Sequence, residues 1–130
     1  MLEPELKGCR ILIVEDEFIV ASSLEMLLQT AGARIVGLAP CVDEALSVIE
    51  SGVTIDIATV DMNLRGESAA PIADALAARA VPFVFMTGAD DNPLFSRYPH
   101  VPRCAKPTDF VRFIDVLLGE LRERSQPSSD

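Results

Sequence analysis

Residues 11–16 read ILIVED, a short apolar run that ends in two carboxylates. Three further segments repeat this arrangement with other polar ends: IATVD at residues 57–61, FVFMTG at residues 83–88 and VPRCAKP at residues 101–107. Short continuous apolar runs between polar residues are typical of strands that are buried on both faces of a parallel sheet. In such sheets the working site lies at the carboxyl ends of the strands, so the four segments predict one shared site.

Helical segments separate the expected strands. Asn92-Pro93 has the form of a helix start, but Pro99 and Pro102 leave room for only a short helix there. Pro102 also places the last strand at a sheet edge, because proline has no N–H to donate to a neighbouring strand. The full pattern predicts strands over residues 10–15, 34–38, 55–60, 81–86 and 101–105, and further helices over residues 17–31, 42–51, 68–77 and 108–121.

These elements predict an α/β fold. Five βα units with right-handed crossovers give a doubly wound, five-stranded parallel sheet of the flavodoxin-like (βα)5 type, with a short or irregular fourth helix. An edge position for the last strand fits the strand order 2-1-3-4-5, which puts strands one and three side by side. The length of 130 residues suits one domain. We expect it to cover residues 1–124, with the polar residues 125–130 as a disordered tail.

Composition excludes several classes of protein. The net charge of −9 argues against a nucleic-acid-binding surface, which needs clustered Lys and Arg. The first residues lack the features of a signal peptide, and no apolar run approaches the ~20 residues that span a bilayer. Cys9, Cys41 and Cys104 show no disulfide or metal-binding spacing and are expected to be free thiols. We therefore expect a cytoplasmic protein without a membrane partner.

The acidic strand ends predict a metal site. If strands one and three are adjacent, Glu15, Asp16 and Asp61 converge, and like charges that close together need a compensating cation. Carboxylate oxygens suit Mg²⁺, which typically binds to a few carboxylates and to phosphate oxygens. Lys106 could supply further positive charge. The alternative, that these acids are merely solvated loop starts, is weakened because Thr87 and Lys106 end their own strands at the same edge.

Asp61 is the candidate nucleophile of this site. Carboxylates can attack phosphorus to form aspartyl-phosphates, and Asp61 ends the central strand. Lys106 could pair with the transferred phosphoryl group, and the hydroxyl of Thr87 could donate to one of its oxygens. Phosphoryl transfer depends mostly on positioning and charge neutralisation, so it needs no dedicated general base.

The chain resembles the receiver domains of two-component response regulators. The similarity spans residues 10–121, and the motifs that carry it are ILIVEDE at 11–17, VDMNLRG at 60–66, MTG at 86–88 and AKP at 105–107. A domain of this kind is a phosphoacceptor and not an enzyme, since it assists only its own phosphorylation and dephosphorylation.

The resemblance also implies roles for individual residues. It implies that Asp16 binds Mg²⁺ directly, that Glu15 acts largely through water, and that the backbone carbonyl of Asn63 completes the protein ligands. It further implies that Asp61 contacts the metal and accepts a phosphoryl group from the phosphohistidine of a histidine kinase. Thr87 and Lys106 would sense this group and draw the neighbouring loops into an active arrangement.

Residues 82–88, PFVFMTG, resemble a narrower branch of the family. This branch carries a Phe-Ala-Thr-Gly-aromatic motif and occurs in single-domain regulators of alphaproteobacteria and at the ends of some kinases. Met86 and Ala89 depart from the motif. Arg103 stands three residues before the lysine, where the wider family has an aromatic gate. The nearby aromatic residues Phe95 and Tyr98 are expected to take part in ordinary packing, with a role as substitute gates as the alternative.

Three readings of the function follow. The first is a phosphorylated switch without a DNA-binding output domain, monomeric or weakly dimeric, that contacts a histidine kinase or phosphotransfer protein; a receiver excised from a hybrid kinase would look the same. The second is a receiver-like interaction module that no longer uses phosphorylation, suggested by Arg103. The third is a phosphatase or a dinucleotide-binding protein, which Asn63 and the acidic turn after the first strand disfavour. Phe18, which follows this turn, is expected to pack on a helix face.

Overall fold

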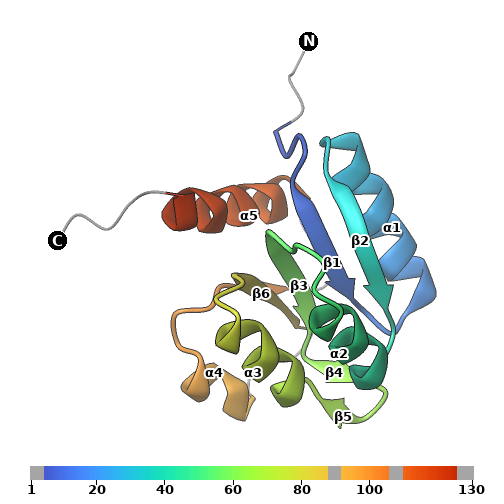
Figure 1. Ribbon diagram of the computed structural model, residues 1–130, viewed down its shortest axis with the longest axis vertical. Helices are drawn as coiled ribbons and strands as arrows, with labels where there is room; N and C mark the ends of the chain where they lie inside the picture. Colours follow the sequence, from blue (N-terminus) through green and yellow to red (C-terminus); the bar gives the residue numbers. More distant parts are fainter. Residues whose placement is uncertain (1–4, 88–91, 106–109, 126–130) are drawn as a thin grey trace, which may run out of the picture.

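A five-stranded parallel sheet forms the centre of the protein (Figure 1). The computed structural model describes residues 5–87, 92–105 and 110–125. Within these residues the spatial order of the sheet is β2-β1-β3-β6-β7, which confirms the predicted fold class and the order 2-1-3-4-5 of the five units. The strands are β1 (Arg10–Val14), β2 (Arg34–Ala39), β3 (Ile57–Asp61), β6 (Phe83–Thr87) and β7 (Arg103–Ala105).

Two further strands, β4 and β5, form a short hairpin outside the main sheet. β4 (Asn63–Leu64) and β5 (Glu67–Ser68) pair antiparallel directly after β3. The sequence analysis did not predict them, because two-residue strands show no periodicity. The turn between them needs positive φ at both central positions, and Arg65 and Gly66 have φ values of 54° and 84°.

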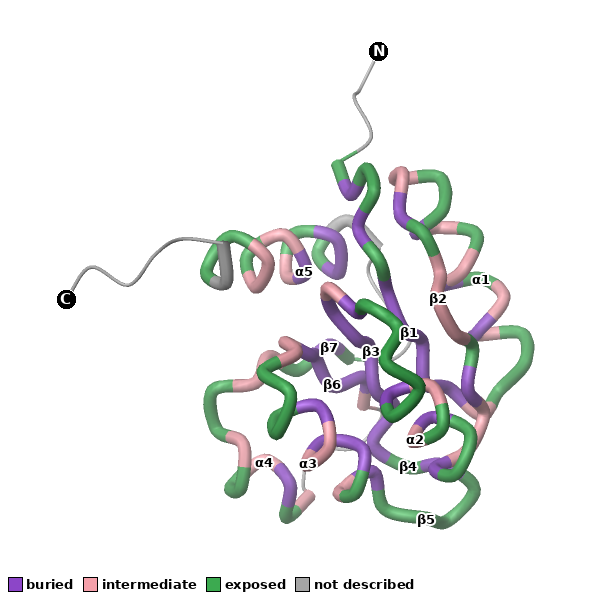
Figure 2. The backbone as a smooth tube through the Cα atoms, viewed as in Figure 1, coloured by how far each residue is buried: buried purple, intermediate pink, exposed green. Residues whose placement is uncertain are grey.

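Helices cover both faces of the sheet. Odd-numbered residues of β1 and β3 pack in one core cluster with α1 and α5, and even-numbered residues pack in another with α2, α3 and α4. The backbone tube shows these strands as the most continuously buried part of the chain (Figure 2). The helices are α1 (Phe18–Thr30), α2 (Val42–Glu50), α3 (Ala70–Ala78), α4 (Pro93–Arg97) and α5 (Phe110–Ser125).

The fourth helix is short, as predicted. It begins after Asn92, whose side chain accepts a hydrogen bond of 2.9 Å from the backbone N–H of Leu94. Pro93 occupies the first helical position, where its missing N–H costs nothing.

The last helix, α5, reaches Ser125, one residue into the segment expected to be a tail. Thr108, the expected start of that helix, lies outside the described residues.

The last strand, β7, lies at the sheet edge and is shorter than predicted. It starts at Arg103 and pairs with β6 alone among the described strands. Pro102 precedes it, and its carbonyl accepts a hydrogen bond of 2.9 Å from the N–H of Phe85. Proline therefore serves here as an acceptor in a position that needs no donor.

Helix α1 is apolar on its outer face as well as on its buried face. Ala21, Leu24 and Leu28 face the sheet, whereas three large apolar side chains are exposed: Phe18 at 79%, Ile19 at 78% and Met26 at 70%. The expectation that Phe18 packs on the fold is therefore wrong. Phe18 is the first residue of the helix and points away from the buried stripe.

The cysteines are free, as expected. All three are described, and none forms a disulfide. Burial raises the pKa of the Cys9 thiol to about 11, so this thiol stays protonated and behaves as a small apolar group.

Among the described helices, none combines the length and the apolar character needed to cross a membrane.

Candidate functional site

Three carboxylates meet at the carboxyl ends of β1 and β3. The two strands are neighbours, with Val14 opposite Val60, so the residues that follow β1 emerge beside the last residue of β3. One oxygen from each of Glu15, Asp16 and Asp61 lies within 4.8 Å of the others. The structure thus brings together the three acids that the sequence analysis assigned to this edge of the sheet.

Backbone N–H groups hold the two buried carboxylates in place. Glu15 and Asp61 are only 3% and 5% exposed, although both carry ionisable groups. Oε2 of Glu15 accepts a hydrogen bond of 3.1 Å from the N–H of Glu17, and Oδ1 of Asp61 accepts one of 3.1 Å from the N–H of Asn63. These bonds orient the carboxylates without supplying a full counter-charge.

Asp16 is tied to the β4–β5 hairpin. Its Oδ2 accepts a hydrogen bond of 3.1 Å from the N–H of Arg65. Burial raises the pKa of the Asp16 carboxyl, but hydrogen bonds from the Arg65 backbone and with Asp61 and Glu15 outweigh this effect, and the pKa lies below its ordinary value. Asp16 is therefore an anion at neutral pH, as a metal ligand must be.

The donor set fits a small divalent cation. All three groups offer hard carboxylate oxygens, which Mg²⁺ prefers, and a cation would relieve the repulsion between them. With Mg–O distances of about 2.1 Å, oxygens on opposite sides of the ion are about 4.2 Å apart. The three carboxylate oxygens lie within 4.8 Å of one another, close enough together for one ion to bind among them.

A cavity of about 740 Å³ opens in front of the acids. Asp16 and Asp61 lie in one wall, and residues of the hairpin and of α4 form the others. Thr87, at the end of β6, also lines the cavity and is half-buried. Arg97 lines the cavity from α4, and among the described lining residues it alone is positively charged.

The remaining predicted site residue falls outside the structure's description. Lys106 is not among the described residues, nor are Gly88, Ala89 and Pro107. Ala105, the residue before the lysine in the sequence, pairs with Thr87 across β6 and β7. The roles assigned to Lys106 stay predictions.

The position of the family's aromatic gate is filled by a cation–π contact. The Arg103 guanidinium lies 4.1 Å from the centroid of the Phe95 ring. Phe95 in turn packs against Phe85, with ring centroids 6.1 Å apart. Tyr98 packs against Phe83, with ring centroids 5.6 Å apart. Phe95 of α4 and Tyr98, the residue after α4, thus both pack against the sheet.

The sequence analysis did not identify Asp74 and Arg97, two charged residues near the cavity. Asp74 on α3 accepts hydrogen bonds from Arg97 and from the hydroxyl of Tyr98. The hydrogen bond to Asp74 raises the pKa of Tyr98, so its hydroxyl stays a donor at neutral pH. No sequence signal identified this contact, since exposed acids and arginines on helices are common.

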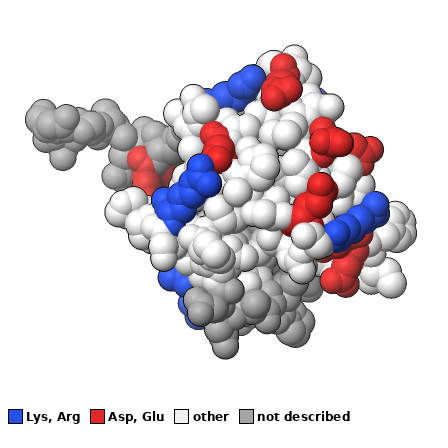
Figure 3. Space-filling model, turned by 90° about the horizontal axis from the view of Figure 1, so that it is seen from below, with Lys and Arg blue, Asp and Glu red and all other residues white. Residues whose placement is uncertain are grey.

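Acidic side chains gather on the face that carries the strand ends. Figure 3 looks at the molecule from below, toward the end to which β1 and β3 run, and red side chains cluster on the right of this view. The three carboxylates of the site are close together and attract cations, and a bound cation would let an anionic group approach them.

A flavodoxin-like sheet with an acid cluster at its switch point defines a class of phosphate and metal-binding folds. The chain belongs to the response regulator receiver domain family, whose model matches residues 11–101. This confirms the predicted membership and makes the protein a module of two-component signalling. None of the curated proteins that were compared with the chain matches it.

Several solved structures are similar to the chain. SdrG from Sphingomonas melonis Fr1 is 41% identical, with a TM-score of 0.76, over 88% of this chain and 97% of that one. The BeF3-activated conformation of SdrG from Pseudomonas melonis Fr1 is 42% identical, with a TM-score of 0.71, over 84% and 95%. The receiver domain of Erythrobacter litoralis PhyR is 23% identical, with a TM-score of 0.82, over 96% and 98%, and this likeness shows the fold alone.

Proposed function

We propose that the protein is a phosphoacceptor switch in which Asp61 receives a phosphoryl group from a histidine kinase or a phosphotransfer protein. The observation that carries this proposal is the convergence of Glu15, Asp16 and Asp61 within 4.8 Å at the end of the central strands. Asp16, Asp61 and the backbone carbonyl of Asn63 would hold Mg²⁺, with Glu15 acting through water. When bound, Mg²⁺ neutralises the charge of the acids and of the phosphoryl oxygens.

The chain's own residues position the reacting groups. The N–H of Asn63 fixes one oxygen of Asp61, whose side chain is largely buried and lines the cavity. A carboxylate oxygen attacks phosphorus, and the phosphorus–nitrogen bond of the donor's phosphohistidine breaks. The electron pair returns to the imidazole nitrogen, which takes a proton from water. Phosphoryl transfer depends mostly on positioning and charge neutralisation, so it needs no general base.

Thr87 and Lys106 would bind the phosphoryl group once it is on Asp61. Thr87 lines the same cavity as Asp61 and carries a hydroxyl that can donate to a phosphoryl oxygen. Lys106 would pair with the same group through its ammonium. The output would be a contact with another protein or onward transfer in a phosphorelay, by a chain that is monomeric or weakly dimeric.

Labelling by a small acyl phosphate in the presence of Mg²⁺ tests this proposal. We expect wild type to gain one hydroxylamine-sensitive phosphoryl group and Asp61→Asn to gain none. Asp56→Asn is the matched control, because Asp56 is an acid at the opposite end of β3, hydrogen-bonded to Arg10. Label retained in Asp61→Asn would place the nucleophile elsewhere.

A module that no longer uses phosphorylation is the second candidate, because Arg103 occupies the place of the aromatic gate. In that case wild type would take up no label, and beryllofluoride with Mg²⁺ would leave the backbone amide signals around Asp61 unchanged. The SdrG structure described as BeF3-activated supports the use of this phosphoryl mimic with a chain 42% identical to it.

A further inference from the structure

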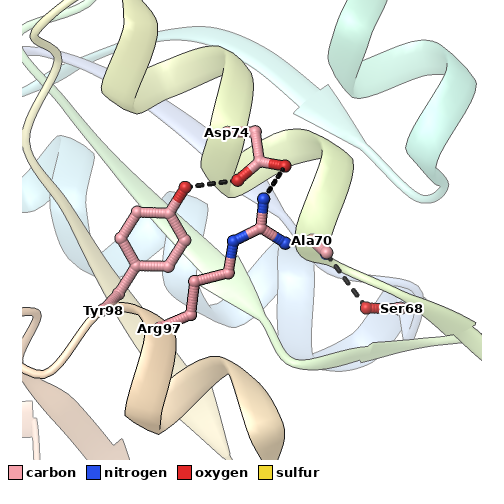
Figure 4. Close-up of polar contacts among 5 residues, drawn as sticks. All are labelled: Ser68, Ala70, Asp74, Arg97 and Tyr98. Carbon is pink, nitrogen blue, oxygen red and sulfur yellow. Dashed lines mark hydrogen bonds and ion pairs between the residues drawn. The ribbon is translucent and has the colours of Figure 1, made fainter.

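Asp74 fastens two helices together beside the acidic cavity (Figure 4). Its Oδ2 accepts a hydrogen bond of 2.7 Å from Nη2 of Arg97, and its Oδ1 accepts one from the hydroxyl of Tyr98. Asp74 belongs to α3, whereas Arg97 ends α4 and Tyr98 follows it. One carboxylate thus uses both oxygens to hold the end of α4 against α3.

Helix α4 is at the same time a wall of the cavity. Pro93, Leu94 and Arg97 of α4 and Asn92 just before it line the same cavity as Asp61. Of the five residues of α4, all of which are described, Leu94 alone is buried. A helix this short has little stability of its own, so its position depends on its contacts with the rest of the fold.

The remaining contacts of α4 are less directional than the Asp74 clamp. The rings of Phe95 and Tyr98 lie with their centroids 5.6 to 6.5 Å from those of Phe83 and Phe85. Such tilted and edge-to-face contacts survive small displacements, whereas two hydrogen bonds to one carboxylate fix both distance and angle. Among the described contacts between α3 and the end of α4, the two bonds to Asp74 are therefore the most directional.

The size of the cavity indicates which arrangement the clamp favours. The space in front of the acids is about 740 Å³. A phosphoryl group and the waters of a magnesium ion amount to roughly five water-sized groups, or on the order of 150 Å³ at about 30 Å³ each. A bound group would therefore fill only roughly a fifth of this space. Any closer approach of the α4 wall would have to move Arg97 and Tyr98 relative to Asp74 on α3, to which both are hydrogen-bonded.

We propose that Asp74 is a positioning residue for this cavity, and that its clamp on Arg97 and Tyr98 holds α4 away from a group bound at Asp61. Occupancy of the acid site and closure of the clamp then oppose each other, and this coupling is reciprocal by thermodynamic necessity. The inference rests on the proposed function, because it assumes that a phosphoryl group or its mimic binds at Asp61. It assigns regulation of that site to a contact on the far side of the cavity.

The affinity for beryllofluoride with Mg²⁺, measured by calorimetric titration, tests the coupling. Tyr98→Phe removes one hydroxyl and keeps the ring in its packing, and Asp74→Ala removes both clamp bonds. We expect each variant to bind the mimic about three- to tenfold more tightly than wild type, the range of one net hydrogen bond. Arg10→Gln is the control, because it removes the ion pair with Asp56 away from the cavity, and its affinity should equal that of wild type.

Amide hydrogen exchange shows whether the clamp holds α4 at all. The N–H groups of Phe95 and Tyr98 bond within the α4 turn, to the carbonyls of Asn92 and Leu94. They should exchange at least threefold faster in Tyr98→Phe than in wild type, with the β3 amides unchanged.

The outcomes separate the two proposals. A wild type without affinity for the mimic contradicts the proposed function and the coupling with it. Equal or weaker affinity in Tyr98→Phe and Asp74→Ala, with normal binding by wild type, contradicts the coupling alone. Destabilisation without a positioning role would weaken binding and could not tighten it. Unchanged exchange of the α4 amides would also overturn the proposal.

Discussion

The centre and the edge of the sheet are built differently. In β3 every residue is buried, and the strand pairs on both sides with four residues of each neighbour. β7 at the edge has three residues, of which Cys104 is buried and Arg103 and Ala105 are exposed. The acid cluster stands on the centre, and the Asp74 clamp stands beside the edge. The proposed phosphorylation site therefore lies on the part of the fold that resists movement. The proposed movement of α4 takes place beside the sheet edge, which fewer contacts hold in place.

The largest effect on stability is expected for Phe85→Ala. Phe85 is fully buried in β6, next to the centre of the sheet, and its removal leaves a cavity that a well-packed sheet cannot close. We expect a loss of about 3–5 kcal/mol in the free energy of unfolding, measured by urea denaturation. A loss below about 1 kcal/mol would show that this side of the sheet repacks as easily as the edge.

Phe95→Ala makes the matched change at the edge. The same side chain is removed, but Phe95 is only partly buried, between Phe85 and the guanidinium of Arg103. We expect a loss of about 1–2 kcal/mol in urea denaturation. A loss equal to that of Phe85→Ala would remove the contrast between centre and edge.

Magnesium should stabilise the centre by binding the native state alone. At a concentration ten times the dissociation constant, the gain for wild type is about 1.4 kcal/mol in the free energy of unfolding. Asp16→Asn, which lacks one ligand of the acid cluster, should gain much less at the same concentration. Glu50→Gln, an exposed acid at the end of α2, is the control and should match wild type. Equal gains in all three proteins would mean that the ion binds elsewhere.

The smallest effect is expected for Thr59→Val, and its sign is the informative part. The hydroxyl of Thr59 is buried in β3 and has no hydrogen-bond partner among the described residues. Its replacement by a methyl group should raise the free energy of unfolding by about 1 kcal/mol. Thr30→Val is the control, because the exposed Thr30 hydroxyl donates to the carbonyl of Met26 and its loss should not stabilise. A destabilised Thr59→Val would indicate that a water satisfies the hydroxyl.

The central strands and the acid cluster could be predicted from the sequence for one physical reason. Strands buried on both faces must be apolar throughout, so their polar ends stand out, and parallel pairing brings these ends together. Glu15, Asp16 and Asp61 were identified in this way. The order of the sheet followed from Pro102, which marked the edge strand.

Other features depend on three-dimensional contacts that leave no periodic signal. The β4–β5 hairpin depends on the positive φ of Arg65, a conformation that arginine does not favour. The clamp at Asp74 depends on where a five-residue helix comes to lie. Phe18 was misjudged because apolar spacing does not tell which side of a helix the fold leaves uncovered. Lys106 remains a prediction, as it lies outside the described residues.

The uncovered side of α1 has a consequence for handling the protein. Phe18, Ile19 and Met26 face solvent on a helix whose single charged residue is Glu25. In dilute buffer, repulsion between molecules of net charge −9 opposes association through these exposed apolar side chains. Salt weakens that repulsion, since the Debye length falls to about 10 Å at 0.1 M. We therefore expect solutions of this protein to become more prone to self-association, and less soluble, as the ionic strength is raised.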